Sequence, residues 1–239
     1  MQPKDRLILA LDFADIDLAH ELADRVRQYF GYVKIGLPLV IGSGLSSVER
    51  LRRAGHQIFL DLKYHDIPSS VQAAVRESAR QCARLVTVHA LGGPSMLRAA
   101  VRALSDLTII PGEQPPRLLA VTVLTHLAAD ELNALGIKDD PRTAAVTLAK
   151  IAQDAGIDGA VASPHEVAAI RKACGNHFLI VCPGIRPTGS QTGDQARVAT
   201  PAQAIRDGAD FLVVGRPVRN ATDPVAAAKA IVDEIAAVC

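Results

Sequence analysis

The chain has 239 residues and a formal charge of +1, and 49% of its residues are hydrophobic although only 3% are aromatic. This charge balance gives no overall field for nucleic acid or an anionic membrane surface, so any anionic ligand has to be bound by a local group of cations. The apolar runs are too short for a membrane helix or a signal-peptide core, which favours a cytoplasmic protein with no nucleic-acid or membrane partner. The length suits one α/β barrel, so we expect a single domain over residues 1–239.

Short apolar runs recur along the chain, each of a length that suits a buried strand. They lie at residues 7–11, 32–37, 57–62, 85–91, 118–124, 159–162, 178–182 and 211–214. Most are rich in Val, Ile and Leu and lack strict polar alternation, which is typical of parallel strands buried on both faces. The runs therefore predict a parallel sheet of eight strands.

The segments between these runs have helical spacing and helix-end signals. Leu18, Leu22, Val26 and Phe30 repeat every four residues and stop at Gly31, which indicates a helix ended by a C-terminal glycine. Helix starts are indicated at Ser163-Pro164-His165-Glu166, Thr200-Pro201-Ala202-Gln203 and Thr222-Asp223-Pro224. Residues 127–142 have no clear assignment. Because strand and helix alternate eight times without a linker, the sequence predicts an α/β fold, a single closed (β/α)8 TIM barrel rather than an open sheet.

The cysteines and histidines indicate structural roles. The cysteines form no C-x-x-C pair, and they do not cluster with histidines at a spacing that suits a metal. We therefore expect reduced thiols and no metal site. His89 ends the fourth run and is expected to be a hydrogen-bonded interior histidine, whereas His65 is expected to support its loop. The remaining histidines are expected to be solvated: His20, His56, His126, His165 and His177.

Polar residues follow the predicted strands at the end where the active sites of such barrels lie. They are Asp12, Lys34, Asp61, Lys63, Asp66, Thr125, the segment Pro183-Gly184-Ile185-Arg186, and Gly215-Arg216. Asp61 and Lys63 are two residues apart on one strand, so their side chains are expected to point the same way, into the barrel mouth. Isolated buried ions cost several kcal/mol, and we expect Lys34, Asp61, Lys63 and Asp66 to neutralise one another. The alternative is a set of salt bridges that only caps the barrel.

The segment Asp61-Leu62-Lys63-Tyr64-His65-Asp66-Ile67-Pro68 resembles the D-x-K-x-x-D signature of the bacterial orotidine 5′-phosphate decarboxylases. The resemblance covers nearly the whole chain, because six further stretches follow in the family's order. They are Leu11-Asp12-Phe13, Val33-Lys34-Ile35-Gly36, Leu124-Thr125, Pro183-Gly184-Ile185-Arg186-Pro187, Gly193-Asp194-Gln195 and Val214-Gly215-Arg216-Pro217. The resemblance implies removal of CO2 from a phosphorylated pyrimidine nucleotide without a cofactor, the last step of de novo UMP biosynthesis.

The resemblance also implies a role for each charged residue of the signature. Lys63 would donate a proton to C6 of the pyrimidine, and Asp61 would lie beside the substrate carboxylate. Lys34 would bridge Asp61 and the ribose. Asp66 and Ser70 would reach the neighbouring subunit's site, which implies a homodimer.

Further substrate contacts follow from the same resemblance. Asp12 would bind ribose hydroxyls, Thr125 would touch the pyrimidine edge, Pro183 would pack on the ring, and Ile67 would also contact the substrate. The phosphate would be bound by Arg186, Gln195, Gly215 and Arg216, with the segment 187–195 closing over it. Glycines let backbone N–H groups approach an anion, and arginine supplies a forked donor, so these residue types suit phosphate.

This chain departs from the family pattern at two places. Ser69-Ser70 stands where the family usually has Asn-Thr, so Ser70 keeps a hydroxyl but lacks a methyl group. His126 follows Thr125 where serine is more familiar. These changes affect fine contacts rather than the reaction.

Two other functions fit parts of the pattern. The first is a Mg2+-dependent sugar-phosphate decarboxylase or aldolase of the same barrel group, but those relatives carry an acid on the second strand, where this chain has Lys34. The second is a nucleotide-phosphate binding protein without catalysis. The presence of both Asp61 and Lys63 speaks against the second alternative.

Overall fold

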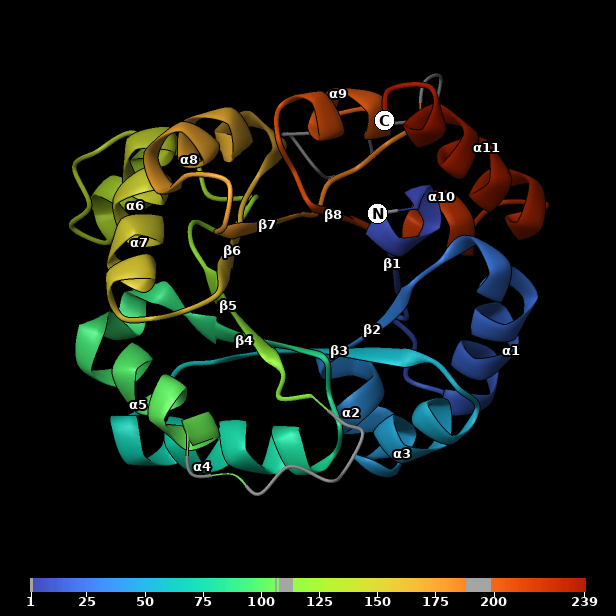
Figure 1. Ribbon diagram of the computed structural model, residues 1–239, viewed down its shortest axis with the longest axis horizontal. Coiled ribbons are helices and arrows are strands. Elements are labelled where there is room, and N and C mark those ends of the chain that lie inside the picture. Colours follow the sequence, from blue (N-terminus) through green and yellow to red (C-terminus); the bar gives the residue numbers. More distant parts are fainter. Residues whose placement is uncertain (1, 106, 108–113, 188–198) are drawn as a thin grey trace.

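The barrel predicted from the sequence is present. The structure, a computed structural model, describes residues 2–105, 107, 114–187 and 199–239. Each parallel strand pairs with the next, and β8 pairs with β1, so the sheet closes into a ring surrounded by helices (Figure 1). The strands are β1 Leu7–Ala10, β2 Tyr32–Gly36, β3 Gln57–Tyr64, β4 Leu85–His89, β5 Arg117–Val121, β6 Gly159–Val161, β7 Leu179–Cys182 and β8 Phe211–Val214. All eight predicted runs therefore contain strands.

The helices follow the strands around the ring. The α-helices are α1 Ile16–Val26, α2 Leu37–Ser43, α3 Ser46–Arg53, α4 Pro68–Arg80, α5 Gly93–Ser105, α6 Ala129–Ala134, α7 Pro141–Asp154, α8 Val167–Cys174, α9 Pro201–Arg206, α10 Arg216–Arg219 and α11 Pro224–Ala236. Short 3-10 turns are η1 Pro3–Arg6, η2 Arg27–Tyr29, η3 Ala90–Gly92 and η4 Pro164–Glu166. Among the described residues, no helix has both the length and the apolar character needed to cross a bilayer.

Helix starts follow the capping signals of the sequence. Thr200 accepts a hydrogen bond from the backbone N–H of Gln203, and Asp223 accepts from the first turn of α11, as predicted. The unassigned stretch 127–142 contains α6 and the capping residue Asp140 of α7.

Alternating side chains of the strands pack into two separate cores. Inward-pointing residues fill the barrel, and outward-pointing residues pack against the helices. The inner core consists of Ile8, Ala10, Phe59, Leu85, Leu119, Val181, Phe211 and Val213. The outer core includes Leu7, Leu9, Val33, Ile35, Ile58, Leu60, Val86 and Val88. This alternation fixes which strand residues can reach the interior, and both Lys34 and Asp61 have the inward parity.

The first helix differs from the sequence prediction. Leu18 is 53% exposed, and the buried stripe instead consists of Ala19, Leu22, Ala23 and Val26. The α-helix ends at Val26 and passes into the turn η2, so Phe30 is outside it. Gly31 lacks the positive φ of a helix-ending glycine. A Cβ at Gly31 would lie 3.0 Å from the Cα of Asp5. The glycine is required by the close approach of the chain start.

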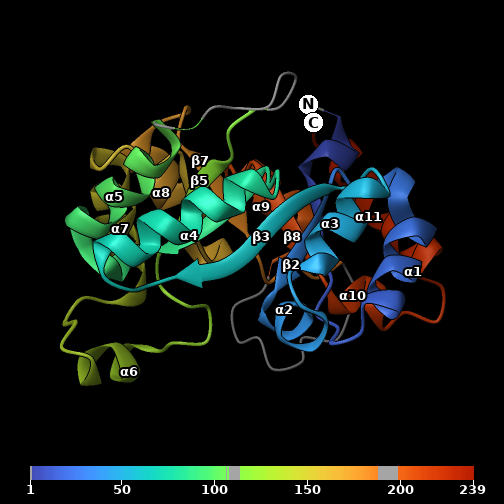
Figure 2. The same ribbon diagram turned by 90° about the horizontal axis from the view of Figure 1, so that it is seen from below.

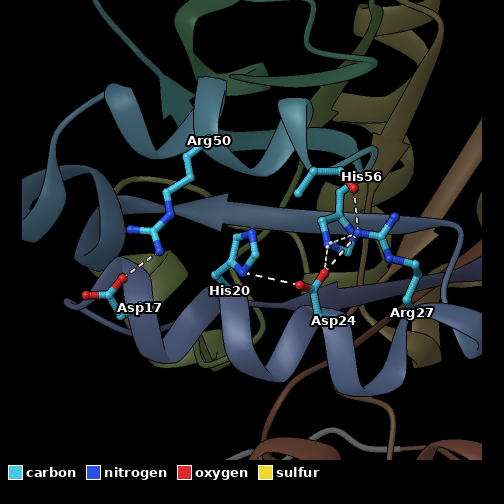
Figure 3. Close-up of polar contacts among 7 residues, drawn as sticks. Asp17, His20, Asp24, Arg27, Arg50 and His56 are labelled. Carbon is cyan, nitrogen blue, oxygen red and sulfur yellow. Dashed lines mark hydrogen bonds and ion pairs between the residues drawn. The ribbon is translucent and has the colours of Figure 1, made fainter.

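A polar cluster joins α1 to the turn between α3 and β3 (Figure 3). The carboxylate of Asp24 contacts Nδ1 of His20 at 3.3 Å, Nη2 of Arg27 at 2.9 Å and Nε2 of His56 at 3.1 Å. The hydrogen bond from Arg27 lowers the pKa of Asp24, while burial lowers the pKa of His56. The side chain of His56 is only 6% exposed, so the prediction that it is solvated was wrong. The side chain of His20 is 26% exposed and is partly solvated. The remaining three, His126, His165 and His177, are exposed as predicted.

Extra helices mark one end of the barrel. In the side view, α2, α6 and α10 lie at the end where the strands terminate, and η1 lies at the opposite end (Figure 2). These short helices follow β2, β5 and β8 directly or through a short loop. They lengthen the connections at the strand ends, where a barrel holds its functional site.

Gly159 gives a test of how tightly β6 and β7 pack. A Cβ at Gly159 would overlap the carbonyl oxygen and the Cβ of Leu179 on the next strand. We expect Gly159→Ala to lower the free energy of unfolding by about 3 kcal/mol, the upper range for overpacking. The matched control is Gly175→Ala, because a Cβ there meets nothing within 4 Å and only the φ of +77° opposes it, which costs about 1 kcal/mol. Urea unfolding measures the free energy of unfolding of both variants. An equal loss in Gly159→Ala and Gly175→Ala would contradict the prediction.

Candidate active site

Four charged side chains form one continuous chain of ion pairs inside the end of the barrel where the strands terminate. Nζ of Lys34 lies 2.9 Å from Oδ1 of Asp12 and 3.4 Å from Oδ2 of Asp61. Nζ of Lys63 lies 2.9 Å from the same Oδ2 of Asp61. Lys34 and Asp61 are buried, whereas the side chains of Asp12 and Lys63 are 43% and 37% exposed. The order Asp12, Lys34, Asp61, Lys63 alternates in sign and sums to zero.

The buried members of this chain stay ionised because each has partners of opposite charge. Burial by itself would raise the pKa of Asp61, but the ammonium groups of Lys34 and Lys63 and the hydrogen bonds from Lys63 and Thr87 hold that pKa below its usual value. Burial would likewise lower the pKa of Lys34, but Asp61 and Asp12 raise it above the usual value. The site therefore keeps fixed charges of both signs in a region largely shielded from water.

The backbone at Lys63 departs from a regular strand. Lys63 has a φ of +51°, in the left-handed region that residues other than glycine rarely adopt. The pairing of β3 with β4 changes register between Leu60 and Tyr64. The backbone N–H of Lys63 donates to Oγ1 of Thr87 at 2.9 Å instead of to a strand carbonyl. The alternation rule correctly placed Lys63 beside Asp61, but this irregular backbone was not predictable from it.

A cavity of about 270 Å³ opens beside the ion pairs. It is lined by the charged residues Asp12, Lys34, Asp61 and Lys63, and by apolar residues after β5 and β6 such as Val123, Leu124 and Ala162. The predicted residues Thr125, Pro183, Arg186, Gly215 and Arg216 also line it. A site lined by both charged and apolar residues suits a flat polar ring attached to an anionic group.

Arginines supply the positive charge at one side of this cavity. Arg186 is 8% exposed, and its Nη1 donates to the carbonyl oxygen of Ile185 at 2.9 Å. Arg216 begins the short helix α10, directly after Gly215. Arg219, which the sequence reasoning missed, lies one turn further on and also lines the cavity. Its spacing of three residues from Arg216 was the available signal.

Arg219 is fixed by two contacts with the loop after β1. Its Nη1 donates to the carbonyl oxygen of Asp12 at 2.7 Å. Its guanidinium carbon lies 5.6 Å from the ring centre of Phe13, a distance that fits a cation–π contact. Arg219 therefore links α10 to the loop that carries Asp12.

Three predicted site residues lie outside this cavity. Asp66 and Ser70 instead line a separate cavity of about 420 Å³ between the end of β3 and α4. Ile67 is 64% exposed. Within the described part of the chain Asp66 makes no ion pair with Lys34 or Lys63, and its Oδ1 accepts from the backbone N–H of Ile67 at 2.6 Å. The expected mutual neutralisation therefore involves Asp12 in place of Asp66. Gln195 lies outside the described residues.

His89 is an interior histidine, as expected from the sequence. It is 9% exposed, its Nδ1 accepts from the backbone N–H of Leu91 at 3.4 Å, and its ring stacks on His65 with centres 5.1 Å apart. Burial, with smaller effects from His65 and Lys63, lowers the pKa of His89 to about 4. The ring is therefore neutral at physiological pH and supports the loop after β3.

The chemistry of the site follows from these groups. A buried carboxylate shared by two ammonium groups provides preorganised charge, and Lys63 has a proton that it can present to the cavity. Among the described residues, no group of three or more His, Cys, Asp or Glu side chains could hold a metal ion. Fold and site together define a (β/α)8-barrel protein with a lysine–aspartate ion-pair network beside a cavity that arginines also line.

Comparisons with known proteins agree with this class. Residues 5–231 match the family described as "Orotidine 5'-phosphate decarboxylase / HUMPS family". The chain is 50% identical over 231 residues to a protein of Anaeromyxobacter sp. (strain K) and 45% identical over 236 residues to one of Moorella thermoacetica, and both are named "Orotidine 5'-phosphate decarboxylase". These alignments cover 97% and 98% of this chain and 98% and 94% of the relatives.

A solved structure extends the agreement to the fold. The crystal structure of orotidine 5′-phosphate decarboxylase from Lactobacillus acidophilus matches with a TM-score of 0.85 and 36% identity, over 97% of this chain and 99% of that one. The chain belongs to the orotidine 5′-phosphate decarboxylase / HUMPS family.

The histidine at the end of β4 gives a prediction about pH. His89 has a folded pKa of about 4, against about 6.5 in an unfolded chain. Between these pH values the unfolded state binds more protons than the folded state. The contribution of His89 to the free energy of unfolding is therefore fully present above pH 6.5 and is lost as the pH falls towards 4. NMR titration should show the ring of His89 protonating near pH 4.

Unfolding measurements give the second part of this test. In His89→Gln the free energy of unfolding should fall less steeply between pH 6.5 and 4 than in the wild type, because one titrating group is removed. A ring of His89 that titrates near the unperturbed histidine value of about 6.5 would contradict the assignment.

Proposed function

We propose that this protein decarboxylates orotidine 5′-monophosphate to uridine 5′-monophosphate and CO2, the last step of de novo pyrimidine biosynthesis. The observation that carries the proposal is the ammonium group of Lys63, held 2.9 Å from the buried carboxylate of Asp61 on the wall of the cavity. Family membership over residues 5–231, and relatives named for this activity, support the same reaction.

The reaction requires a cation at one position in the ring plane. When the bond from C6 to the carboxyl carbon breaks, its electron pair stays on C6 in the plane of the pyrimidine, where the π system cannot absorb it. Lys63 stabilises this pair through its charge and then transfers a proton from Nζ to C6. CO2 leaves, and the neutral amine of Lys63 regains a proton from solvent. No cofactor is required for this balance of atoms and electrons.

Asp61 and Lys34 set the charges around the reacting carbon. Asp61 lies beside the substrate carboxylate, and its fixed negative charge is less unfavourable after CO2 has left. Lys34 holds Asp61 on one side and Asp12 on the other, at 3.4 and 2.9 Å. Asp12 binds the ribose hydroxyls together with Lys34.

The remaining contacts bind the two ends of the nucleotide. Thr125 touches the edge of the pyrimidine and Pro183 packs on its face. Arg186, Gly215 and Arg216 bind the phosphate together with Gln195, at the loops after β7 and β8, where barrels commonly bind phosphate. Arg219 is added to this group because it lines the same cavity. Binding energy from the phosphate holds the ring against Lys63.

We also propose a homodimer in which the Asp66 and Ser70 side chains of one subunit act in the site of the other. Both residues lie outside the substrate cavity of their own chain. Large apolar side chains are exposed nearby, at the ends of three consecutive strands: Leu37 and Ile41 on α2, Ile67 after β3 and Leu91 after β4. Exposed apolar residues gathered at one end are typical of a surface that is covered by a partner.

The magnesium-dependent alternative fits the site less well. A divalent cation needs several free oxygen ligands, but the carboxylates of Asp12 and Asp61 are both bound to the ammonium of Lys34.

A direct assay separates the candidate functions. Loss of substrate absorbance on adding orotidine 5′-phosphate in the presence of EDTA is the expected result. No turnover of orotidine 5′-phosphate would exclude the proposed activity, and Mg2+-dependent turnover of a sugar phosphate would favour the alternative.

Substituting the proposed proton donor tests its role. We expect Lys63→Ala to lower kcat by at least about 1000-fold, with a much smaller effect on binding of uridine 5′-monophosphate, because the ammonium acts mainly in the transition state. Steady-state kinetics and calorimetry measure the two effects. Lys150, on α7 on the outside of the barrel, provides the control Lys150→Ala, which should leave kcat unchanged. A Lys63→Ala enzyme within tenfold of wild type would remove Lys63 from this role.

The shared site can be tested with mixed dimers. Lys63→Ala and Asp66→Asn should each be nearly inactive. If Asp66 serves the neighbouring subunit, a dimer of one of each has one intact site, and co-expression should restore about a quarter of wild-type activity.

The control for this experiment pairs two residues that must act within one subunit. Lys63→Ala mixed with Asp61→Asn should give no recovery, since every site in that mixture has one defect. Failure of the Lys63→Ala and Asp66→Asn pair to recover activity would place Asp66 in the site of its own chain.

A further inference from the structure

The side chain of Thr87 connects the two reacting groups of the site without lining the substrate cavity. Thr87 lies within β4, points into the barrel and is 0% exposed. It faces the part of β3 where the pairing skips from Leu60 to Tyr64, so no regular strand pairing is present at this point. It is not among the residues that line the cavity beside Lys63.

The Thr87 hydroxyl makes two hydrogen bonds with different directions. It accepts from the backbone N–H of Lys63 at 2.9 Å and donates to Oδ1 of Asp61 at 3.1 Å. The direction is settled by chemistry, since an N–H can only donate and an ionised carboxylate can only accept. The single proton of the hydroxyl is therefore committed to Asp61. The other carboxylate oxygen, Oδ2, receives the ammonium groups of Lys63 and Lys34.

This arrangement holds the strained backbone of Lys63. A residue other than glycine in the left-handed region costs about 1–3 kcal/mol, and such strain persists only where surrounding contacts fix it. The hydrogen bond to Thr87 is a contact of this kind, because it satisfies the N–H of Lys63 at its φ of +51°. The φ of Lys63 sets the direction in which its side chain leaves the strand. The same hydroxyl thus fixes the start of the lysine side chain and the orientation of the carboxylate that holds its far end.

We propose that Thr87 is a positioning residue that sets the geometry between the proton donor Lys63 and the carboxylate of Asp61. This inference rests on the proposed function. An apolar residue would fill the barrel interior as Leu85 does on the same strand, and a buried hydroxyl without partners would be costly. Packing alone therefore does not explain a hydroxyl group at this position, whereas its two hydrogen bonds to Lys63 and Asp61 do.

The test compares variants that differ only in the hydroxyl group. Thr87→Val removes the hydroxyl and keeps the shape, while Thr87→Ser keeps the hydroxyl and loses a methyl group. The matched control is Thr122→Val, because Thr122 is also 0% exposed and its hydroxyl donates to the backbone carbonyl of Val161 at 3.0 Å rather than to Asp61. Decarboxylation by the wild type is measured first, so that failure of the proposed function is distinguished from failure of this inference.

A change in kcat without a matching change in binding is the expected signature. Displacing a reacting group by about 1 Å can cost 100-fold, so we expect Thr87→Val to lower kcat by about 100-fold relative to Thr122→Val. KM and the affinity for uridine 5′-monophosphate should change by less than about threefold, because Thr87 does not line the cavity. Thr87→Ser should retain kcat to within about fivefold of wild type. A merely structural role would affect Thr87→Val and Thr122→Val alike.

Three results would overturn the proposal. They are a Thr87→Val enzyme within about 20-fold of Thr122→Val in kcat, a loss in Thr87→Ser as large as in Thr87→Val, and a rise in KM that accounts for the whole loss of kcat/KM. If Thr87→Val does not fold, as judged by circular dichroism, Thr87→Ser and Thr87→Ala are compared instead. These two differ by one oxygen atom, and a ratio of kcat values below about 20 would then overturn the proposal.

Discussion

The burial of the Asp61 carboxylate is the constraint around which this end of the barrel is arranged. An isolated carboxylate in a largely dry site costs several kcal/mol, and only opposite charges and hydrogen bonds of good geometry offset that cost. Asp61 has all of these, from Lys34, Lys63 and Thr87. Removing any one of them leaves the remaining groups incompletely compensated, so these residues are expected to act as a unit rather than as independent contributors.

The parallel barrel explains how residues far apart in the sequence meet at Asp61. Inward residues of neighbouring strands lie side by side, and on β2, β3 and β4 further inward positions follow the apolar layer towards the end where the strands terminate. Lys34, Asp61 and Thr87 occupy three such positions, above the apolar layer that includes Phe59 and Leu85. Strand alternation therefore brings the charges together, and the inner core beneath them keeps their spacing fixed.

The sequence predicted the fold because eight apolar runs mark eight buried strands. It predicted much of the cavity lining because polar residues follow those strands, and because Asp61 and Lys63 are two residues apart on one strand. Predictions failed where one position depends on a distant segment. Gly31 is required by the approach of Asp5, and His56 is buried by contact with α1, and neither requirement is visible in the local pattern.

Other parts of the site could not be predicted because they follow from irregular backbone or from a choice between equivalent partners. Alternation assumes a regular strand, so it cannot indicate the φ of +51° at Lys63 or the hydroxyl of Thr87 that meets it. Charge counting alone could not decide whether Asp12 or Asp66 completes the neutral set. The structure selects Asp12, because the loop after β1 brings it within 2.9 Å of Lys34.

The two lysines on Asp61 have different environments, and this difference favours Lys63 as the acid. Lys34 lies between two carboxylates, its side chain is 11% exposed, and its partners raise its pKa, so it holds its proton tightly. Among the described residues Lys63 has one carboxylate partner, its side chain is 37% exposed, and it lines the cavity. A proton is delivered most readily by the cation that has fewer competing acceptors and can reach the ligand. In the proposed reaction, Lys34 would be the fixed charge that keeps Asp61 ionised while Lys63 gives up its proton.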